Sequence, residues 1–97
     1  MNNKYVVYIH ICPNNKKYIG ITSCKNPNRR WQSGKGYVGS KYFYNATNKY
    51  GWENIEHIIM AENLTEIEAK QMEVNLIYIN KSNNRKYGYN ISTGGLS

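Results

Sequence analysis

The chain has 97 residues, which suits one small domain, and its formal net charge is +7. It lacks both an apolar stretch long enough to span a membrane and the apolar core of a signal peptide, so we expect one domain over residues 1–97 in an intracellular, reducing compartment. The two cysteines and two histidines form no CxxC or HxxxH pair, so a structural zinc site is not expected.

Positive charge is concentrated in the first half of the chain. Residues 1–50 hold seven Lys and two Arg without an acidic residue, whereas all six Glu lie between 51 and 75 and Asp is absent. A stretch of one sign repels itself unless it meets a polyanion, and nucleic acid is the commonest such partner. The alternative is a generally basic protein without that partner.

The first elements form a hairpin followed by a short helix. Apolar and aromatic residues alternate over 4–12, a turn follows at 13–15, and residues 17–22 form the returning strand. Asn26 is the expected N-cap of the helix, with Pro27 at its first position, and the helix is expected to end near Gly34.

The remaining elements complete an α+β domain. We expect a loop over 34–39 and a helix over 40–51 that Ser40 caps. Thr65 and Glu68 have the spacing of a capping box, which opens a helix ending near residue 80. The expected apolar face of this helix consists of Ala69, Met72, Leu76 and Ile79. With strands at 55–61 and 88–92, the order is ββααβαβ around a small antiparallel or mixed sheet.

Two tyrosine motifs of the hairpin give the sequence its most specific signal. Val6-Val7-Tyr8 and Tyr18-Ile19-Gly20 resemble the paired motifs that name the GIY-YIG nuclease family. The second motif is intact, whereas the first keeps only its tyrosine. Further matches follow in the family's order, at Arg30-Trp31, Tyr50-Gly51-Trp52, Glu73 and Gly88-Tyr89-Asn90. The chain is thus similar, from residue 5 to about 95, to the catalytic domain of phage-type GIY-YIG homing endonucleases.

This resemblance implies a metal-dependent DNA endonuclease with one divalent ion, Mg²⁺ or Mn²⁺, held by Glu73. Many members carry a histidine one turn after the arginine, but here that position is Gly34, and Tyr37 is the candidate replacement. Arg29 and Glu68 are the nearest rivals of Arg30 and Glu73. The implied catalytic residues are Tyr8, Tyr18, Arg30, Tyr37, Glu73 and Asn90.

The chemistry of phosphodiester hydrolysis agrees with this set. The reaction needs an activated water and a cation near the developing charge, and with no Asp present the metal ligand must be a Glu. One carboxylate suits Mg²⁺, which keeps several of its waters, and Arg30 offers bidentate geometry to phosphate. Tyr8 could accept the proton of the water if a nearby cation lowered its pKa from about 10.

Double-stranded DNA is the expected partner, and neither a membrane, an obligate protein partner nor a separate DNA-recognition domain is indicated. Lys17, Arg29, Lys35 and Lys41 are the expected contacts with its phosphates. Two other hypotheses remain open, a catalytically inactive basic module that binds DNA or RNA on the same fold, and a basic protein associated with RNA or translation. A metal-dependent cleavage assay separates the nuclease from both.

Overall fold

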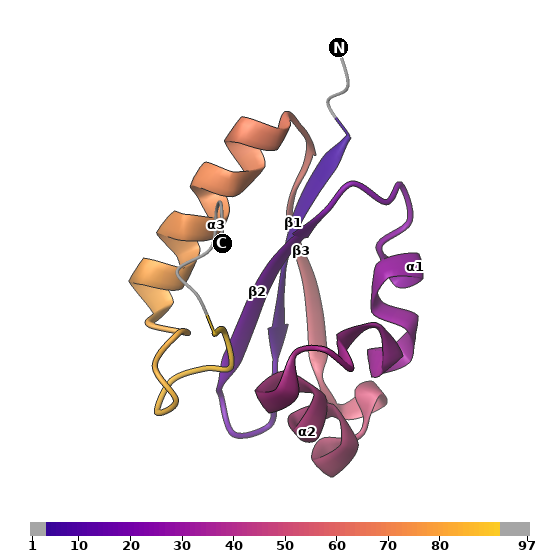
Figure 1. Ribbon diagram of the computed structural model, residues 1–97, viewed down its shortest axis with the longest axis vertical. Coiled ribbons are helices and arrows are strands. Elements are labelled where there is room, and N and C mark those ends of the chain that lie inside the picture. Colours follow the sequence, from indigo (N-terminus) through magenta and orange to yellow (C-terminus); the bar gives the residue numbers. More distant parts are fainter. Residues whose placement is uncertain (1–3, 92–97) are drawn as a thin grey trace.

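A three-stranded antiparallel sheet in the order β2-β1-β3 lies at the centre of the computed structural model, which describes residues 4–91 (Figure 1). Helices flank this sheet on both sides, and the α+β class expected from the sequence is confirmed. In chain order the elements are β1 (Tyr5–Ile11), β2 (Lys17–Thr22), α1 (Pro27–Trp31), the 3-10 segment η1 (Gln32–Tyr37), α2 (Lys41–Tyr50), the 3-10 segment η2 (Trp52–Asn54), β3 (Glu56–Leu64) and α3 (Glu66–Asn80).

The central strand β1 sets the geometry of the sheet because it pairs with both neighbours. Tyr8 lies opposite Gly20 of β2, and His10 lies between Tyr18 of β2 and His57 of β3. Successive residues of a strand point to opposite faces, so Tyr8 and His10 share one face of β1. The residues paired with them across the sheet lie on that face as well.

The two faces of the sheet carry different cores. Against one face α3 buries aliphatic side chains, centred on Ile9, Ile19 and Ile77. Against the other face α1, η1 and α2 enclose an aromatic core (Figure 1). The buried members of this aromatic core are Tyr8, Cys12, Trp31, Tyr37, Phe43, Ala46 and Ile55.

Polar side chains cap the N-termini of α1 and α3, as the sequence predicts. The side chain of Asn26 accepts a hydrogen bond from the backbone N–H of Asn28 at 3.0 Å, and Thr65 and Glu68 form the capping box. Ser40 was expected to cap α2, but its side chain makes no capping hydrogen bond. Two of the three expected N-caps are therefore present.

Residues 34–39 were expected to form a loop, but residues 34–37 belong to the 3-10 segment η1. The backbone is left-handed at Ser33 and Gly34, which breaks this segment into two turns. Gly36 passes so close to the backbone carbonyl of Arg30 that a Cβ atom there would clash with it. Because the backbone passes this close to Arg30, the next residue, Tyr37, lies in the core, where its side chain is fully buried.

The helix α3 turns most of its predicted apolar face to the sheet, and only the last predicted residue is wrong. Ala69 is buried and Leu76 is half-buried against the aliphatic core, whereas Ile79 is 71% exposed and Ile77 is buried instead. Apolar residues also lie on the outer side of this helix, with Ile67 and Tyr78 exposed, so the spacing alone does not determine which residue of the last turn is buried. Within residues 4–91 no helix is both long and apolar enough to cross a membrane.

The closing segment, expected as a strand over 88–92, is an isolated parallel bridge between Lys17 and Gly88 within the described residues. The backbone N–H of Lys17 donates to the carbonyl of Tyr87 at 3.2 Å, and its carbonyl accepts from the N–H of Tyr89 at 2.9 Å. Ser92 lies outside the described residues. The segment bonds to the side of β2 that faces away from β1, since β2 is an edge strand of the sheet.

The pairing of Tyr8 with Gly20 explains the glycine of the second tyrosine motif. A Cβ atom on Gly20 would lie 2.6 Å from the hydroxyl oxygen of Tyr8 and 2.7 Å from the ring carbon that carries it. The Tyr8 side chain is fully buried, so the ring has little room to move aside. Gly20 therefore provides the space in which the Tyr8 ring lies across β2.

We expect Gly20→Ala to lower the free energy of unfolding by about 1–3 kcal/mol, the usual range for overpacking a filled core. The control is Gly39→Ala, because a Cβ atom on Gly39 would meet nothing within 4 Å. Urea denaturation of both variants measures the difference. Equal stabilities of the two variants would contradict the close approach of Tyr8 to Gly20.

Candidate active site

Four of the predicted catalytic residues meet in the aromatic layer, with Tyr37 at their centre. The hydroxyl groups of Tyr37 and Tyr8 are hydrogen-bonded at 3.0 Å. The ring of Tyr18 packs edge-on against that of Tyr37, with centroids 5.1 Å apart. The guanidinium of Arg30 lies over the Tyr37 ring, 4.7 Å from its centroid. The tyrosine expected to replace the family histidine is thus in contact with three other members of the set.

Arg30 is held in this cluster by more than its stacking on Tyr37. One of its terminal nitrogens, Nη1, donates a hydrogen bond to the carbonyl of Gly36 at 2.6 Å. Arg30 is half-buried, whereas Arg29 is exposed on the same helix. The structure therefore brings Arg30 to the tyrosines and leaves Arg29 on the surface.

Burial controls the acidity of the tyrosines. It raises the pKa of Tyr8 to about 12, although the charge of Arg30 acts in the opposite direction. Burial likewise raises the pKa of Tyr37, and the neighbouring Tyr8 adds to the effect. The sequence led us to expect that a cation would lower the pKa of Tyr8, but burial outweighs the cation.

Two histidines that the sequence analysis did not include extend the cluster. The Nε2 atom of His10 lies 2.8 Å from the hydroxyl of Tyr37, and its Nδ1 atom lies 2.8 Å from Nδ1 of His57. The Nε2 atom of His57 is hydrogen-bonded to the carbonyl of Trp52 at 3.1 Å. A continuous series of hydrogen bonds thus runs from Tyr8 to the carbonyl of Trp52.

The position of His10 two residues after Tyr8 was the available signal, because the two residues share a face of β1. The family pattern instead suggests a histidine one turn after Arg30, where this chain has Gly34. Only the register between β1 and β3 shows that His57 lies beside His10. These contacts join residues 27 and 47 positions apart, which sequence spacing does not reveal.

Both histidines are held in the neutral form. Burial, together with the neighbouring His57 and Arg30, lowers the pKa of His10 to about 2. Burial also lowers the pKa of His57, although its bond to the carbonyl of Trp52 opposes that shift. His57 is half-buried and stacks on the Trp52 ring at 4.0 Å between centroids.

Trp31 contributes a polar group to the same place. Its indole ring packs edge-on against the Tyr8 ring, with centroids 5.3 Å apart. The indole nitrogen is buried and has no hydrogen-bond partner among the described residues. A buried donor without a partner is costly, which suits a site where negative charge develops on a nearby oxygen.

Asn90 acts on the strand that carries Tyr18. Its side-chain oxygen accepts a hydrogen bond from the N–H of Ile19 at 2.9 Å, and its side-chain nitrogen donates to the carbonyl of Ile19 at 2.8 Å. Asn90 is buried and thus holds β2 directly beside Tyr18. In this arrangement Asn90 contacts the backbone of the strand that carries Tyr18.

Glu73 lies in α3, half-buried, in the layer on the other side of the sheet from Tyr8. Within residues 4–91 no three His, Cys or Glu side chains gather in a way that could hold a metal by protein ligands alone. A single carboxylate nevertheless fits Mg²⁺, because this ion keeps several waters and shares ligands with phosphate oxygens. Glu73 is therefore a suitable donor for such an ion.

The expected DNA contacts are mostly on the surface. Arg29, Lys35 and Lys41 are exposed, whereas Lys17 is half-buried and its backbone bonds to the closing segment. The three exposed residues belong to α1, η1 and the start of α2, which cover the aromatic face of the sheet. This side of the protein combines the tyrosine cluster with positive charge.

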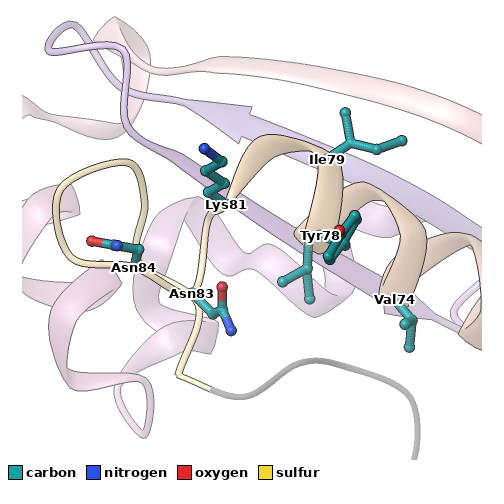
Figure 2. A pocket seen from close by; sticks show the side chains of 7 residues that line it. Val74, Tyr78, Ile79, Lys81, Asn83 and Asn84 are labelled. Carbon is teal, nitrogen blue, oxygen red and sulfur yellow. The ribbon is translucent and has the colours of Figure 1, made fainter.

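A separate pocket of about 540 Å³ lies at the end of α3 (Figure 2). Val74 and Tyr78 line it from the helix, and Lys81, Asn83 and Asn84 line it from the following turn. None of its lining residues belongs to the predicted catalytic set. The pocket is thus distinct from the tyrosine cluster.

Comparison with known families agrees with this geometry. The family of GIY-YIG catalytic domains matches residues 4–90, which include the hairpin, Arg30, Glu73 and Asn90. Searches of curated proteins and of solved structures found no match. The match covers most of the chain and belongs to a nuclease family, whose substrates are nucleic acids. On this evidence the chain belongs to the GIY-YIG family of nuclease catalytic domains.

Proposed function

We propose that the domain is an endonuclease that hydrolyses phosphodiester bonds of double-stranded DNA with one divalent ion, Mg²⁺ or Mn²⁺. The contact of Arg30 with the Tyr8–Tyr37 pair carries this proposal, because it joins a fixed positive charge to a group that can exchange a proton. A positive charge near the phosphate and a group that accepts a proton are both needed when water attacks a phosphate.

In the proposed reaction Arg30 binds a non-bridging oxygen of the phosphate. Among the described residues its guanidinium uses one hydrogen bond, to the carbonyl of Gly36, which leaves other N–H groups for the substrate. The guanidinium stays charged at all relevant pH values and matches phosphate in shape. Stacking on Tyr37 fixes its direction before the substrate binds.

Tyr8 receives the proton of the attacking water in this proposal, and the half-buried Tyr18 borders the same site. The Tyr8 side chain is only 1% exposed, so the reaction requires that DNA binding delivers one water to its hydroxyl group. Excluding other water at that moment strengthens the attraction between Arg30 and the phosphate.

A metal ion bound by Glu73 would stabilise the charge on the phosphate and the leaving oxygen. Glu73 and the tyrosines come from opposite layers, but β2 is an edge strand of the sheet, and α3 packs against it. A DNA strand that crosses this edge can meet side chains from both layers. The proposed substrate position is therefore this edge of the sheet near Tyr18, next to the closing segment that bonds to Lys17 and Ile19.

The charge distribution supports a duplex substrate. The first fifty residues carry only positive charge, and Arg29, Lys35 and Lys41 expose that charge on the side of the tyrosine cluster. Each phosphate neutralised contributes a slope of about −0.9 in log K against log salt for duplex DNA. Binding by these residues is sequence-independent, because phosphate contacts position the protein without reading bases.

We expect Arg30→Ala to reduce nicking of supercoiled plasmid in Mg²⁺ by about 100-fold or more, because a donor to transition-state charge is lost. Arg29→Ala is the matched control, since it removes an exposed guanidinium from the neighbouring position of the same helix. It should retain most of the activity. Equal activities of the two variants would show that Arg30 takes no part in the reaction. If the parent protein itself did not nick DNA, the inactive binding module would be favoured.

We expect Glu73→Gln to abolish both Mg²⁺ binding, measured by titration calorimetry, and plasmid nicking, because Mg²⁺ prefers charged oxygen ligands. Glu68→Gln is the control, since Gln also serves at this position of a capping box. The folded state should survive both changes, because Gln forms helices as well as Glu does. Metal binding that is lost in Glu68→Gln and kept in Glu73→Gln would place the ion elsewhere on α3.

A further inference from the structure

We propose that Tyr8, Tyr37, His10 and His57 form a proton relay that carries the proton of the attacking water away from the site to His57. The proposal rests on the nuclease function, since it identifies the route by which the base of that site loses its proton. It gives a catalytic part to two histidines that neither tyrosine motif contains.

The relay consists of bonds that are all within hydrogen-bonding distance. The oxygens of Tyr8 and Tyr37 are 3.0 Å apart, and the Tyr37 oxygen is 2.8 Å from Nε2 of His10. The two Nδ1 atoms of His10 and His57 are 2.8 Å apart. Each group can both give and receive one proton, as a relay requires.

The last bond of the series fixes the direction of all the others in the resting protein. The carbonyl of Trp52 can only accept, so Nε2 of His57 carries a proton. Since the His57 ring is neutral, its Nδ1 must accept from Nδ1–H of His10.

His10 and Tyr37 extend this direction along the rest of the series. The neutral His10 then accepts at Nε2 from the hydroxyl of Tyr37. A hydroxyl has a single proton and can rotate, so a Tyr37 hydroxyl that donates to His10 instead of to Tyr8 has its oxygen free to receive the Tyr8 proton. Every proton in the resting series therefore points from Tyr8 towards His57.

The passage of one proton along the series, by four transfers, reverses this direction. As the water loses a proton to the Tyr8 oxygen and its own oxygen bonds to phosphorus, the bond from phosphorus to the leaving nucleotide oxygen breaks, and that oxygen takes a proton from a solvent water. In the same step the Tyr8 proton moves to Tyr37 and that of Tyr37 moves to Nε2 of His10. The Nδ1 proton of His10 moves to Nδ1 of His57, which becomes a cation. Tyr37 now donates to Tyr8, and both tyrosines remain neutral. After the product leaves, the transfers reverse, and Tyr8 releases the proton to an incoming water.

The relay explains how the buried Tyr8 can accept a proton at neutral pH. Tyr8 alone is a poor base, because burial raises its pKa to about 12 and little phenolate exists at neutral pH. In the relay Tyr8 gives up its own proton as it receives one, so no phenolate accumulates. The effective base becomes the His57 imidazole, whose pKa lies below 6.5 and which is therefore neutral at physiological pH.

His57 is the suitable end of the relay because of its place in the fold. It lies on the edge strand β3 and is half-buried, whereas His10 is fully buried. The groups that face it are His10 and the rings of Trp31 and Trp52. At the other end Arg30, Tyr18, Tyr37 and Trp31 act on Tyr8. The positive charge on the relay thus forms at the end remote from Arg30 and the phosphate.

Nitrogen-detected NMR of the two histidines tests the relay without DNA or metal. Near pH 8 we expect His10 to be protonated at Nδ1 alone and His57 at Nε2 alone. This arrangement supports the proposal whether or not the protein cuts DNA. A neutral His57 beside a His10 protonated at Nε2 would overturn the proposal, because the series would then break between the two rings.

The pH dependence of cleavage provides the second test. We expect the parent rate to rise through the pKa of His57, below pH 6.5, and to be level above it, because only the neutral ring accepts a proton. His57→Gln should lower the level rate by about 100-fold, in the range of general-base effects, and the remaining activity should rise steadily with alkaline pH as Tyr8 ionises.

Glu56→Gln is the control for this variant, since it changes an exposed neighbour on the same strand. It should keep the parent profile. A His57→Gln protein that is folded, as judged by its thermal unfolding, and that cuts with the parent rate and profile would overturn the relay while leaving the nuclease function intact.

Discussion

The register of β1 with its two neighbours is the constraint on which the site depends. It places Gly20 opposite Tyr8, where the missing side chain leaves space for the ring, and it places His57 beside His10. A shift of one residue would turn these side chains to the aliphatic face under α3. The two tyrosine motifs are therefore a single structural unit, in which the glycine of one motif accommodates the tyrosine of the other.

Burial orders the side chains of this site but makes it unfavourable for any one of them to gain or lose a proton. The aromatic layer fixes Tyr8, Tyr37 and His10 with little freedom to move, and it also makes ionisation of each of them unfavourable. Hydrogen bonds between neutral groups are what such surroundings tolerate best. Neutral groups that exchange protons in concert can thus work where isolated charges cannot, and Arg30, half-buried near the surface, supplies the permanent charge.

Local signals in the sequence predicted most of the fold, because they depend on neighbouring residues. Alternation predicted β1 and β2, and the Asn26 cap and the capping box at Thr65 predicted α1 and α3. On α3 the spacing predicted the burial of Ala69 but not that of Ile77 in place of Ile79, since apolar residues of the last turn occur on several sides. For the site, the motifs predicted Tyr8, Tyr37 and Arg30, which lie together. His57 could not be found in this way, because its contact with His10 arises only from the pairing of distant strands.

The clamp that Asn90 makes on Ile19 has a consequence for the order of assembly during synthesis. The two residues are 71 positions apart, so β2 is fixed on this side only after nearly all the residues described have left the ribosome. Local turns and the hairpin close much earlier, because shorter loops lose less entropy. The bonds that hold the strand carrying Tyr18 on this side therefore form only after Asn90 has left the ribosome, and a nascent chain acquires a fully ordered site no earlier than that.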